Sequence, residues 1–451
     1  MSERANFGSK LGVILATAGS AVGLGNVWRF PYMTGQNGGA AFIIIYVLCV
    51  LALGIPCMVN EFIIGRHGQA NTARAYRKLA GRTPWGLVGY LGVLTGFLIM
   101  GYYAVVSGWC LQYVWASLAG QLQGDPDYFQ RYFTDMSSSP LIPVFWTVAI
   151  LLASYVIIEK GVRDGIERAS KWMMPTLFIL LLLIVVASCC LPHAGKGIEY
   201  LFMPDFSKVT GSVVLSALGQ AFYSLSIAMG ALATYASYFS RQTNLTNSAS
   251  QIAIIACIVA VLAGLMIFPA AFSVGISPDS GPSLIFITLP NVFQQAFAAV
   301  PMVGYIVELM FFVLLSLAAL TSLISLHEAA TAFLEEEGHI ARRWAALWVT
   351  IASAIIGALC SLSLGAVDGL SVFGMTLFSL FDFVTAQIFL PIGGFLTCIF
   401  MGWIIPRQLI RDEFTNGGTL RGRLLGVYLI LIRYVCPLLI IGIFLHQFGW
   451  L

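Results

Sequence analysis

A thirteen-residue stretch near the start of the chain, residues 19–31, carries groups that could bind an ion or a small polar molecule. It reads Gly-Ser-Ala-Val-Gly-Leu-Gly-Asn-Val-Trp-Arg-Phe-Pro, with three glycines within seven residues. Glycine weakens a helix by about 1 kcal/mol and proline by about 3 kcal/mol. We therefore expect a helix that breaks here and leaves backbone oxygens and amides without helical partners.

The two kinds of freed backbone group suit two kinds of ligand. The carbonyls of Gly19, Ala21 and Val22, with the side-chain amide oxygen of Asn26, suit a hard cation such as sodium, which prefers oxygen ligands. The N–H groups of residues 23–25 would start a new half-helix and suit an anion such as a carboxylate. The stretch is thus a candidate site for a cation and a carboxylate side by side.

Further candidate ligands stand in two other apolar segments. Thr321 and Ser322 are adjacent hydroxyls three residues after Ala318, and they offer oxygen ligands for a cation. The alternative is that they bond to their own helix backbone or pack between helices. Tyr103 could donate to a bound carboxylate, and its alternative role is packing in the core.

The composition indicates that these groups lie in membrane-spanning segments. Of 451 residues, 59% are hydrophobic and only 10% are charged, whereas soluble chains carry about 25% charged residues. The sequence therefore predicts an all-α polytopic membrane protein, one transporter domain over residues 1–451. A spanning helix needs about 20 apolar residues, and eleven spans are expected: 10–34, 40–65, 86–118, 140–158, 167–191, 210–239, 248–274, 299–334, 343–362, 371–403 and 424–449.

Several function classes find no support. The five histidines are scattered, and no nucleophile, base and acid occur together at mid-span, so an enzyme is not expected. The nine cysteines form no Cys-x-x-Cys pair and are interpreted as small core residues rather than a disulfide or metal framework. Nothing indicates a nucleic-acid partner; the lipid bilayer is the expected surrounding.

Lysine and arginine in the loops predict the orientation. With the N-terminus in the cytoplasm, 18 of these residues fall in cytoplasmic loops or flanks and three in outer loops. Cytoplasmic loops carry the excess of positive charge. We expect a cytoplasmic N-terminus and an outer C-terminus.

The sixth predicted span, like the first, contains residues that should interrupt its helix. Residues 219–230 place Gln220, Ser224, Ser226 and Gly230 in mid-span. Broken helices at matching positions of two halves indicate a transporter built from inverted repeats. We predict a 5+5 arrangement, with repeats at 10–191 and 210–403 and an additional helix at 424–449.

Charged residues near the spans are candidate gates. Arg29 and Asp382 would lie outward of the break and could close over a ligand; Arg4 and Glu336 could form an inner latch or be two solvated loop charges. Charges within a membrane are costly and usually functional. Glu61 could hold backbone N–H groups of a broken helix.

These features together resemble the neurotransmitter:sodium symporter family, in particular its bacterial amino-acid transporters with the LeuT-like fold. The resemblance covers nearly the whole chain. It rests on the 19–31 motif, Asn37-Gly-Gly39, Gly54-Ile-Pro56, Glu61, Gly65-Arg66, Gly165-Ile-Glu-Arg168, Thr234-Tyr-Ala-Ser-Tyr238, Phe286-Ile-Thr-Leu-Pro290 and Leu320-Thr-Ser322.

The resemblance implies Na⁺-driven symport of an amino acid by alternating access. It implies a bacterial inner membrane as the location. It also implies a sodium site where the first predicted span, 10–34, meets the eighth, 299–334, with ligands Gly19, Val22, Ala318, Thr321 and Ser322. The gates would be Arg29 with Asp382 outside and Arg4 with Glu336 inside, with Tyr238 nearby and Phe7 where a Trp is common. The implied substrate pocket is Ala21, Gly23, Leu24, Gly25, Ile99, Tyr103, Tyr223, Ser224, Ser226, Met229, Ser322 and Leu326.

The chain departs from the family pattern in the seventh predicted span, residues 248–274, which is helix 7 of the family. A second sodium site would use Ala21, Asn26 and Ser224, the substrate carboxylate and a helix 7 Asn or Asp, but Ala256 stands at that position. Ala260 stands where animal members bind chloride. We predict that the second sodium site is weakened or lost and that chloride is not required; an alignment slip or a water in place of the missing ligand is the alternative.

The implied pocket wall is apolar and carries no acid, so the expected substrate is a neutral, hydrophobic amino acid. Two other functions stay open. One is an amino-acid sensor that does not transport, and the other is a transporter of the same fold for another small solute. The protein is expected to be a monomer or a homodimer.

Overall fold

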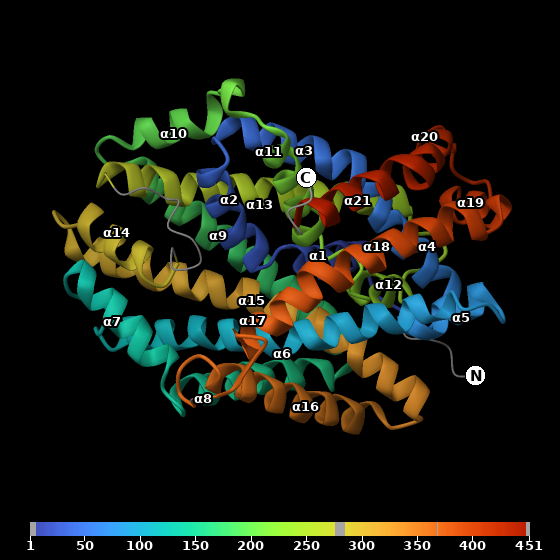
Figure 1. Ribbon diagram of the computed structural model, residues 1–451, viewed down its shortest axis with the longest axis horizontal. Helices are drawn as coiled ribbons and strands as arrows, with labels where there is room; N and C mark the ends of the chain where they lie inside the picture. Colours follow the sequence, from blue (N-terminus) through green and yellow to red (C-terminus); the bar gives the residue numbers. More distant parts are fainter. Residues whose placement is uncertain (1–5, 276–284, 368, 448–451) are drawn as a thin grey trace.

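The computed structural model describes residues 6–275, 285–367 and 369–447, which are overwhelmingly helical (Figure 1). The helices are α1 Lys10–Ala21, η1 Gly25–Arg29, α2 Phe30–Gln36, α3 Ala40–Cys49, η2 Val50–Gly54, α4 Ile55–Gly68, α5 Thr72–Ala80, α6 Gly86–Leu118, α7 Pro126–Ser137, α8 Ile142–Ile158, η3 Val162–Glu167, α9 Arg168–Cys189, α10 Ala194–Phe202, η4 Phe206–Lys208, α11 Gly211–Ser224, α12 Ala231–Ala236, α13 Leu245–Ser273, α14 Thr288–Ala296, α15 Pro301–Gly338, α16 Arg342–Leu362, α17 Leu377–Asp382, η6 Phe383–Phe389, α18 Leu390–Ile399, η7 Phe400–Ile404, α19 Arg407–Phe414, α20 Leu425–Ile430, η8 Leu431–Val435 and α21 Cys436–Gln447.

The long apolar helices are those of a polytopic membrane protein. In the described residues, eight continuous helices are long and apolar enough to cross a bilayer, or ten if each of two bent helix pairs counts as one span. The predicted count of eleven and the boundaries of the two inverted repeats stay predictions. The predicted tenth span begins late, because residues 371–376 form a small hairpin of β1 Ser371–Val372 paired with β2 Met375–Thr376.

The expected break in the first span is confirmed. The helix α1 ends at Ala21, and the chain resumes helical structure at Gly25, with a bend of 55° between the two parts. The side chain of Ser9 caps the start of α1 by accepting from the N–H of Gly12. The break lies in the middle of the molecule, where α1 packs against both α13 and α15 (Figure 1).

The expected break in the sixth span is also confirmed. The helix α11 ends at Ser224 and α12 begins at Ala231. Between them Ser226, Ala228 and Gly230 have φ angles of 53°, 65° and 71°, and such left-handed conformations are strained in residues other than glycine. Buried Glu61 of α4 accepts a hydrogen bond of 2.6 Å from the N–H of Ala228. A carboxylate thus replaces the helical partner that this strained segment lacks.

Candidate functional site

A small cavity of about 40 Å³ lies at the two helix breaks. Every residue of the predicted substrate pocket except Leu24 lines it, and these side chains come from the broken first and sixth spans, α6 and α15. Leu24 faces a neighbouring, larger cavity instead. The lining residues are Ser20, Ala21, Gly23, Gly25, Asn26, Ile99, Tyr103, Tyr223, Ser224, Ser226, Met229, Ser322, Ser325 and Leu326.

The break in the first span presents donors to this cavity. In the described residues, no acceptor takes the N–H groups of Gly23 or Gly25, while the N–H of Leu24 donates to the Tyr103 hydroxyl over 3.4 Å. The segment Gly25–Gln36 begins at this point, so its partly positive end faces the same space. The hydroxyl of Tyr103 and these amides are placed to bind one anionic group.

The predicted first sodium ligands lie together at the contact of α1 with α15. The Ser322 hydroxyl is 3.5 Å from the Gly19 carbonyl oxygen. The Thr321 hydroxyl donates to the Ala318 carbonyl over 3.0 Å, and the Thr321 side chain lies directly against Gly19. Val22, the fifth predicted ligand, is buried at the end of α1 with its own N–H bonded to Ala18. Hydroxyl and carbonyl oxygens are the donor set that a hard cation prefers.

The predicted second sodium site has an available oxygen at Asn26 but lacks a side-chain oxygen from α13. Asn26 is fully buried and donates from its Nδ2 to the Ala256 carbonyl over 3.2 Å. Its Oδ1 has no hydrogen-bond partner among the described residues, so it is available as a ligand. The Ser224 hydroxyl lies 2.9 Å from that of Tyr46. The residue of α13 that contacts Asn26 is therefore Ala256, the residue expected from the family resemblance, and its side chain has no oxygen.

The two predicted outer gate residues line the larger cavity, of about 560 Å³. No ion pair within 4 Å joins Arg29 to Asp382, although both lie in the described part of the chain; the Arg29 guanidinium instead lies 4.6 Å from the ring centre of Tyr223. Tyr103 and Tyr223 line both cavities and stand between them. The two predicted gate residues thus do not form an ion pair in this structure, and two aromatic side chains lie between their cavity and the smaller one.

The opposite end of the site is closed by packed side chains. Phe7 packs on Tyr235, Tyr238 and Phe239 with ring centres 6.1–6.3 Å apart. Glu336 accepts hydrogen bonds from Asn71. Arg4, its predicted partner, lies outside the described residues.

Comparison with known proteins identifies the family to which this chain belongs. The model of the sodium:neurotransmitter symporter family matches residues 4–126 and 123–449. The chain belongs to the sodium:neurotransmitter symporter family. It is a transporter and not an enzyme.

Individual relatives of this symporter agree with the assignment. An uncharacterized sodium-dependent transporter of Bacillus subtilis, YhdH, is 37% identical over 100% of this chain and 99% of its own length. An uncharacterized sodium-dependent transporter of Haemophilus influenzae is 32% identical over 99% of this chain and 98% of its own. The crystal structure of MhsT in complex with L-phenylalanine matches with a TM-score of 0.88 and 38% identity, covering 98% of this chain and 99% of that one.

Sequence reasoning missed several residues of the symporter's site. Ser20 accepts at its backbone oxygen from the hydroxyls of Ser226 and Ser322, and its own hydroxyl bonds to Ser325 over 2.8 Å. Ser325 follows Ser322 by three residues and so lies on the same helix face; that spacing was an available signal.

A buried charged network beneath the cavity was also missed. Glu328, fully buried on α15, pairs with Arg342 and accepts from the Tyr238 hydroxyl over 2.6 Å. Arg342 starts the next helix, 14 residues after Glu328, whereas Tyr238 lies 90 residues before it. The packing of α15 against its neighbours brings the three side chains together.

Proposed function

We propose that this protein is a secondary transporter that couples the entry of Na⁺ to the symport of a neutral amino acid by alternating access. The observation that carries the proposal is the position of Ser322. Its hydroxyl lies 3.5 Å from the carbonyl oxygen of Gly19, in the predicted sodium site, and it also lies against Gly23, in the predicted carboxylate site. A single side chain therefore links the ion to the substrate, so that binding of one favours binding of the other.

The lining of the cavity supports a neutral amino acid with an apolar side chain. The carboxylate would bind the amides of Gly23 and Gly25 and the hydroxyl of Tyr103. The side chain would lie among Ile99, Met229 and Leu326, and none of the residues that line this cavity is an acid or a base. The bound L-phenylalanine of MhsT, a structural neighbour over nearly the whole chain, is a substance of this class.

A cavity of about 40 Å³ holds only a few water molecules, so substrate entry requires side chains to move. Tyr223 and Tyr103 stand between this cavity and the vestibule that Arg29 and Asp382 line. We infer that the vestibule is the outer entrance, that these tyrosines part to admit the substrate, and that Arg29 then approaches Asp382. This orientation corresponds to a cytoplasmic N-terminus in a bacterial inner membrane.

The ion stoichiometry follows from the two candidate sodium sites. In the predicted site between α1 and α15, carbonyl and hydroxyl oxygens lie close together, while the site at Asn26 lacks a side-chain oxygen from α13 because Ala256 stands there. We infer one strongly bound Na⁺ per cycle and no need for chloride. One charge moved through the membrane potential contributes about 2.3 kcal/mol per 100 mV. One coupled ion can therefore maintain a smaller ratio of inner to outer substrate concentration than two coupled ions can.

The decisive experiment is uptake of labelled L-phenylalanine or L-leucine into proteoliposomes that contain the purified protein. We expect accumulation with an inward Na⁺ gradient and none when K⁺ replaces Na⁺. A thermal-shift screen of the twenty amino acids with and without Na⁺ defines the substrate. If no amino acid binds in the presence of Na⁺, the proposal fails; if one binds but labelled substrate does not exchange in counterflow, the protein is a sensor.

A further inference from the structure

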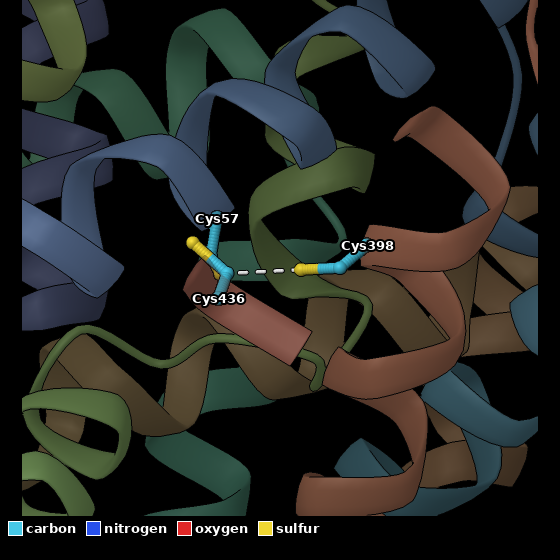
Figure 2. A group of neighbouring side chains, drawn as sticks. All are labelled: Cys57, Cys398 and Cys436. Atoms are coloured by element: carbon cyan, nitrogen blue, oxygen red, sulfur yellow. Dashed lines mark hydrogen bonds between the residues drawn. The ribbon is translucent and has the colours of Figure 1, made fainter. Parts of the chain in front are cut away.

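Three cysteines that are far apart in the sequence lie together between α4, α18 and α21. Cys57, Cys398 and Cys436 are all buried and free, and their Sγ atoms lie within 4.8 Å of one another. Figure 2 shows Cys57 and Cys436 side by side, with Cys398 facing them from the third helix. Among the described residues, no other trio of His, Cys, Asp or Glu side chains comes together in this way. We call these three residues the cysteine cluster.

The spacing within the cysteine cluster is that of ligands around one ion. The Sγ atoms of Cys57 and Cys398 are 3.7 Å apart. Thiolates bind Zn²⁺ at about 2.3 Å, so two sulfurs on one ion stand roughly 3.8–4.0 Å apart in tetrahedral or trigonal geometry. The sulfurs therefore need to move little to hold an ion between them.

The backbone around the cysteine cluster departs from regular helix at each of its three members. The π-helical segment η2 ends at Gly54, shortly before Cys57; η7 begins at Phe400, two residues after Cys398; and η8 ends directly before Cys436. Such single-turn π segments occur frequently at functional sites. The thiol of Cys436 donates to the carbonyl of Ala52 in η2 over 3.6 Å. Each cysteine of the cluster thus lies within three residues of an irregular segment.

The surroundings of the cysteine cluster can support thiolates. The side-chain amide of Asn60 donates to the sulfur of Cys398 over 3.7 Å, and Tyr428 holds Asn60 by donating to its Oδ1 over 2.6 Å. Hydrogen bonds of this kind orient metal ligands and stabilise their charged form. No carboxylate or imidazole belongs to the set, and an all-sulfur set selects soft ions over Na⁺, Mg²⁺ and Ca²⁺. The cysteine cluster is thus chemically distinct from the sodium sites.

We propose that the cysteine cluster binds one thiophilic d¹⁰ metal ion, of the Zn²⁺ or Cu(I) class. On binding of a divalent ion, two thiols release their protons to solvent or buffer and bind as thiolates, which neutralise the ion, while the third sulfur binds as a neutral thiol. Binding of Cu(I) releases one proton and uses one thiolate in the same way. The ion joins α4 to α18 and α21. Cys57 lies one helical turn before Glu61, which holds the Ala228 N–H at the break of the sixth span. The bound ion therefore fixes the helix that supports this break.

The test uses the purified full-length protein in detergent, kept reduced with a phosphine, and Cd²⁺ as the probe. We expect one Cd²⁺ per protein after gel filtration, a thiolate-to-cadmium absorption band, and an X-ray absorption spectrum with three sulfur neighbours. A large excess of Na⁺ should not displace the ion. Each of the variants Cys57→Ser, Cys398→Ser and Cys436→Ser should bind Cd²⁺ at least about tenfold more weakly.

The matched controls are Cys110→Ser and Cys360→Ser, two buried cysteines outside the cluster, which should bind Cd²⁺ as the parent does. The proposal is overturned if Cd²⁺ binds the parent without sulfur neighbours or not at all, or if all three cluster variants retain its affinity. The absorption spectrum of the parent decides the question even if a variant fails to fold.

Discussion

The side chain of Asn26 and the backbone of Ala256 are joined across the centre of the molecule, because the Asn26 Nδ2 donates to the Ala256 carbonyl oxygen over 3.2 Å. This contact fixes the amide so that its Oδ1, which has no partner in the described residues, is left for another ligand. It also places Ala256 of α13 beside the predicted second sodium site. An oxygen at this one position would complete that site.

The first prediction follows directly from this contact. Ala256→Asn adds a carboxamide oxygen beside Asn26, and we expect the Hill coefficient for Na⁺ in substrate binding to rise from about one toward two. The measurement is scintillation-proximity binding of a labelled amino acid over a range of Na⁺ concentrations. Ala263→Asn, at another fully buried alanine of α13, is the control and should leave the coefficient unchanged. Two-sodium cooperativity in the unaltered protein would contradict the one-ion interpretation.

The second prediction concerns the predicted sodium site between α1 and α15. Thr321→Ala removes one hydroxyl ligand, and we expect the Na⁺ affinity to fall at least about tenfold, which corresponds to about 1.4 kcal/mol. Thr331→Ala, at a buried threonine further along α15, should behave as the parent. Sodium titrations followed by tryptophan fluorescence give both values. Equal Na⁺ affinity in the two variants would show that Thr321 is not a ligand.

The third prediction separates substrate from ion. Tyr103→Phe removes the hydroxyl that lies beside the free amides, and a hydrogen bond to a charged group is worth about 1.5–3 kcal/mol. We therefore expect amino-acid affinity to fall by about tenfold or more, with Na⁺ affinity in the absence of substrate unchanged. In the control Tyr113→Phe the lost hydroxyl donates to the carbonyl of Phe286 instead, so substrate affinity should be maintained. The assay is isothermal titration calorimetry with the substrate defined by the screen.

The fourth prediction concerns the support of the sixth span. Glu61→Leu leaves the buried N–H of Ala228 without an acceptor, which costs about 1–3 kcal/mol, whereas Glu61→Gln keeps an oxygen at the same place. We expect the apparent melting temperature in detergent to fall clearly for Glu61→Leu and less for Glu61→Gln. The same melting temperature for both variants would mean that the acceptor at Glu61 does not hold the break.

The fifth prediction concerns how the protein's stability depends on pH through Glu413, which lies outside the membrane-spanning helices. Burial raises the pKa of Glu413 in α19, but hydrogen bonds from His67 and the charge of Arg66 outweigh it and hold the pKa below the ordinary value of 4.5. Because the folded pKa is lowered, this carboxylate stabilises the protein fully above about pH 4.5 and loses its contribution as the pH falls through the folded value. Melting curves at acidic pH should show a steeper loss of stability for the parent than for Glu413→Gln. Parallel curves would contradict the ion pair's role.

The two helix breaks could be predicted because their causes are local. Glycines and polar side chains within an apolar run weaken a helix wherever it is folded, and both breaks appear where the sequence placed them. The pocket residues other than Leu24 were predicted through the family resemblance, and they line one cavity. Leu24 faces the vestibule because the bend between Ala21 and Gly25 turns it away from its neighbours.

Other features depended on contacts between distant segments. The hairpin at 371–376 replaced the start of a predicted helix, since Phe373 and Gly374 adopt positive φ angles that a helix does not allow. Ser20 was missed because its backbone oxygen makes its main contacts: it accepts hydrogen bonds from the hydroxyls of Ser226, in the break of the sixth span, and Ser322, in α15. A side-chain pattern carries no sign of such a contact.

The sequence by itself determined that this is a polytopic membrane protein, where its helices break and which family it belongs to, because composition, local helix propensity and motif order are properties of the linear chain. The tertiary structure alone decided which groups meet. It places Ala256 opposite Asn26, pairs Glu328 with Arg342, and gathers Cys57, Cys398 and Cys436 from three helices. These meetings depend on helix packing and on the register shifts at π-helical turns, which spacing along the sequence does not encode.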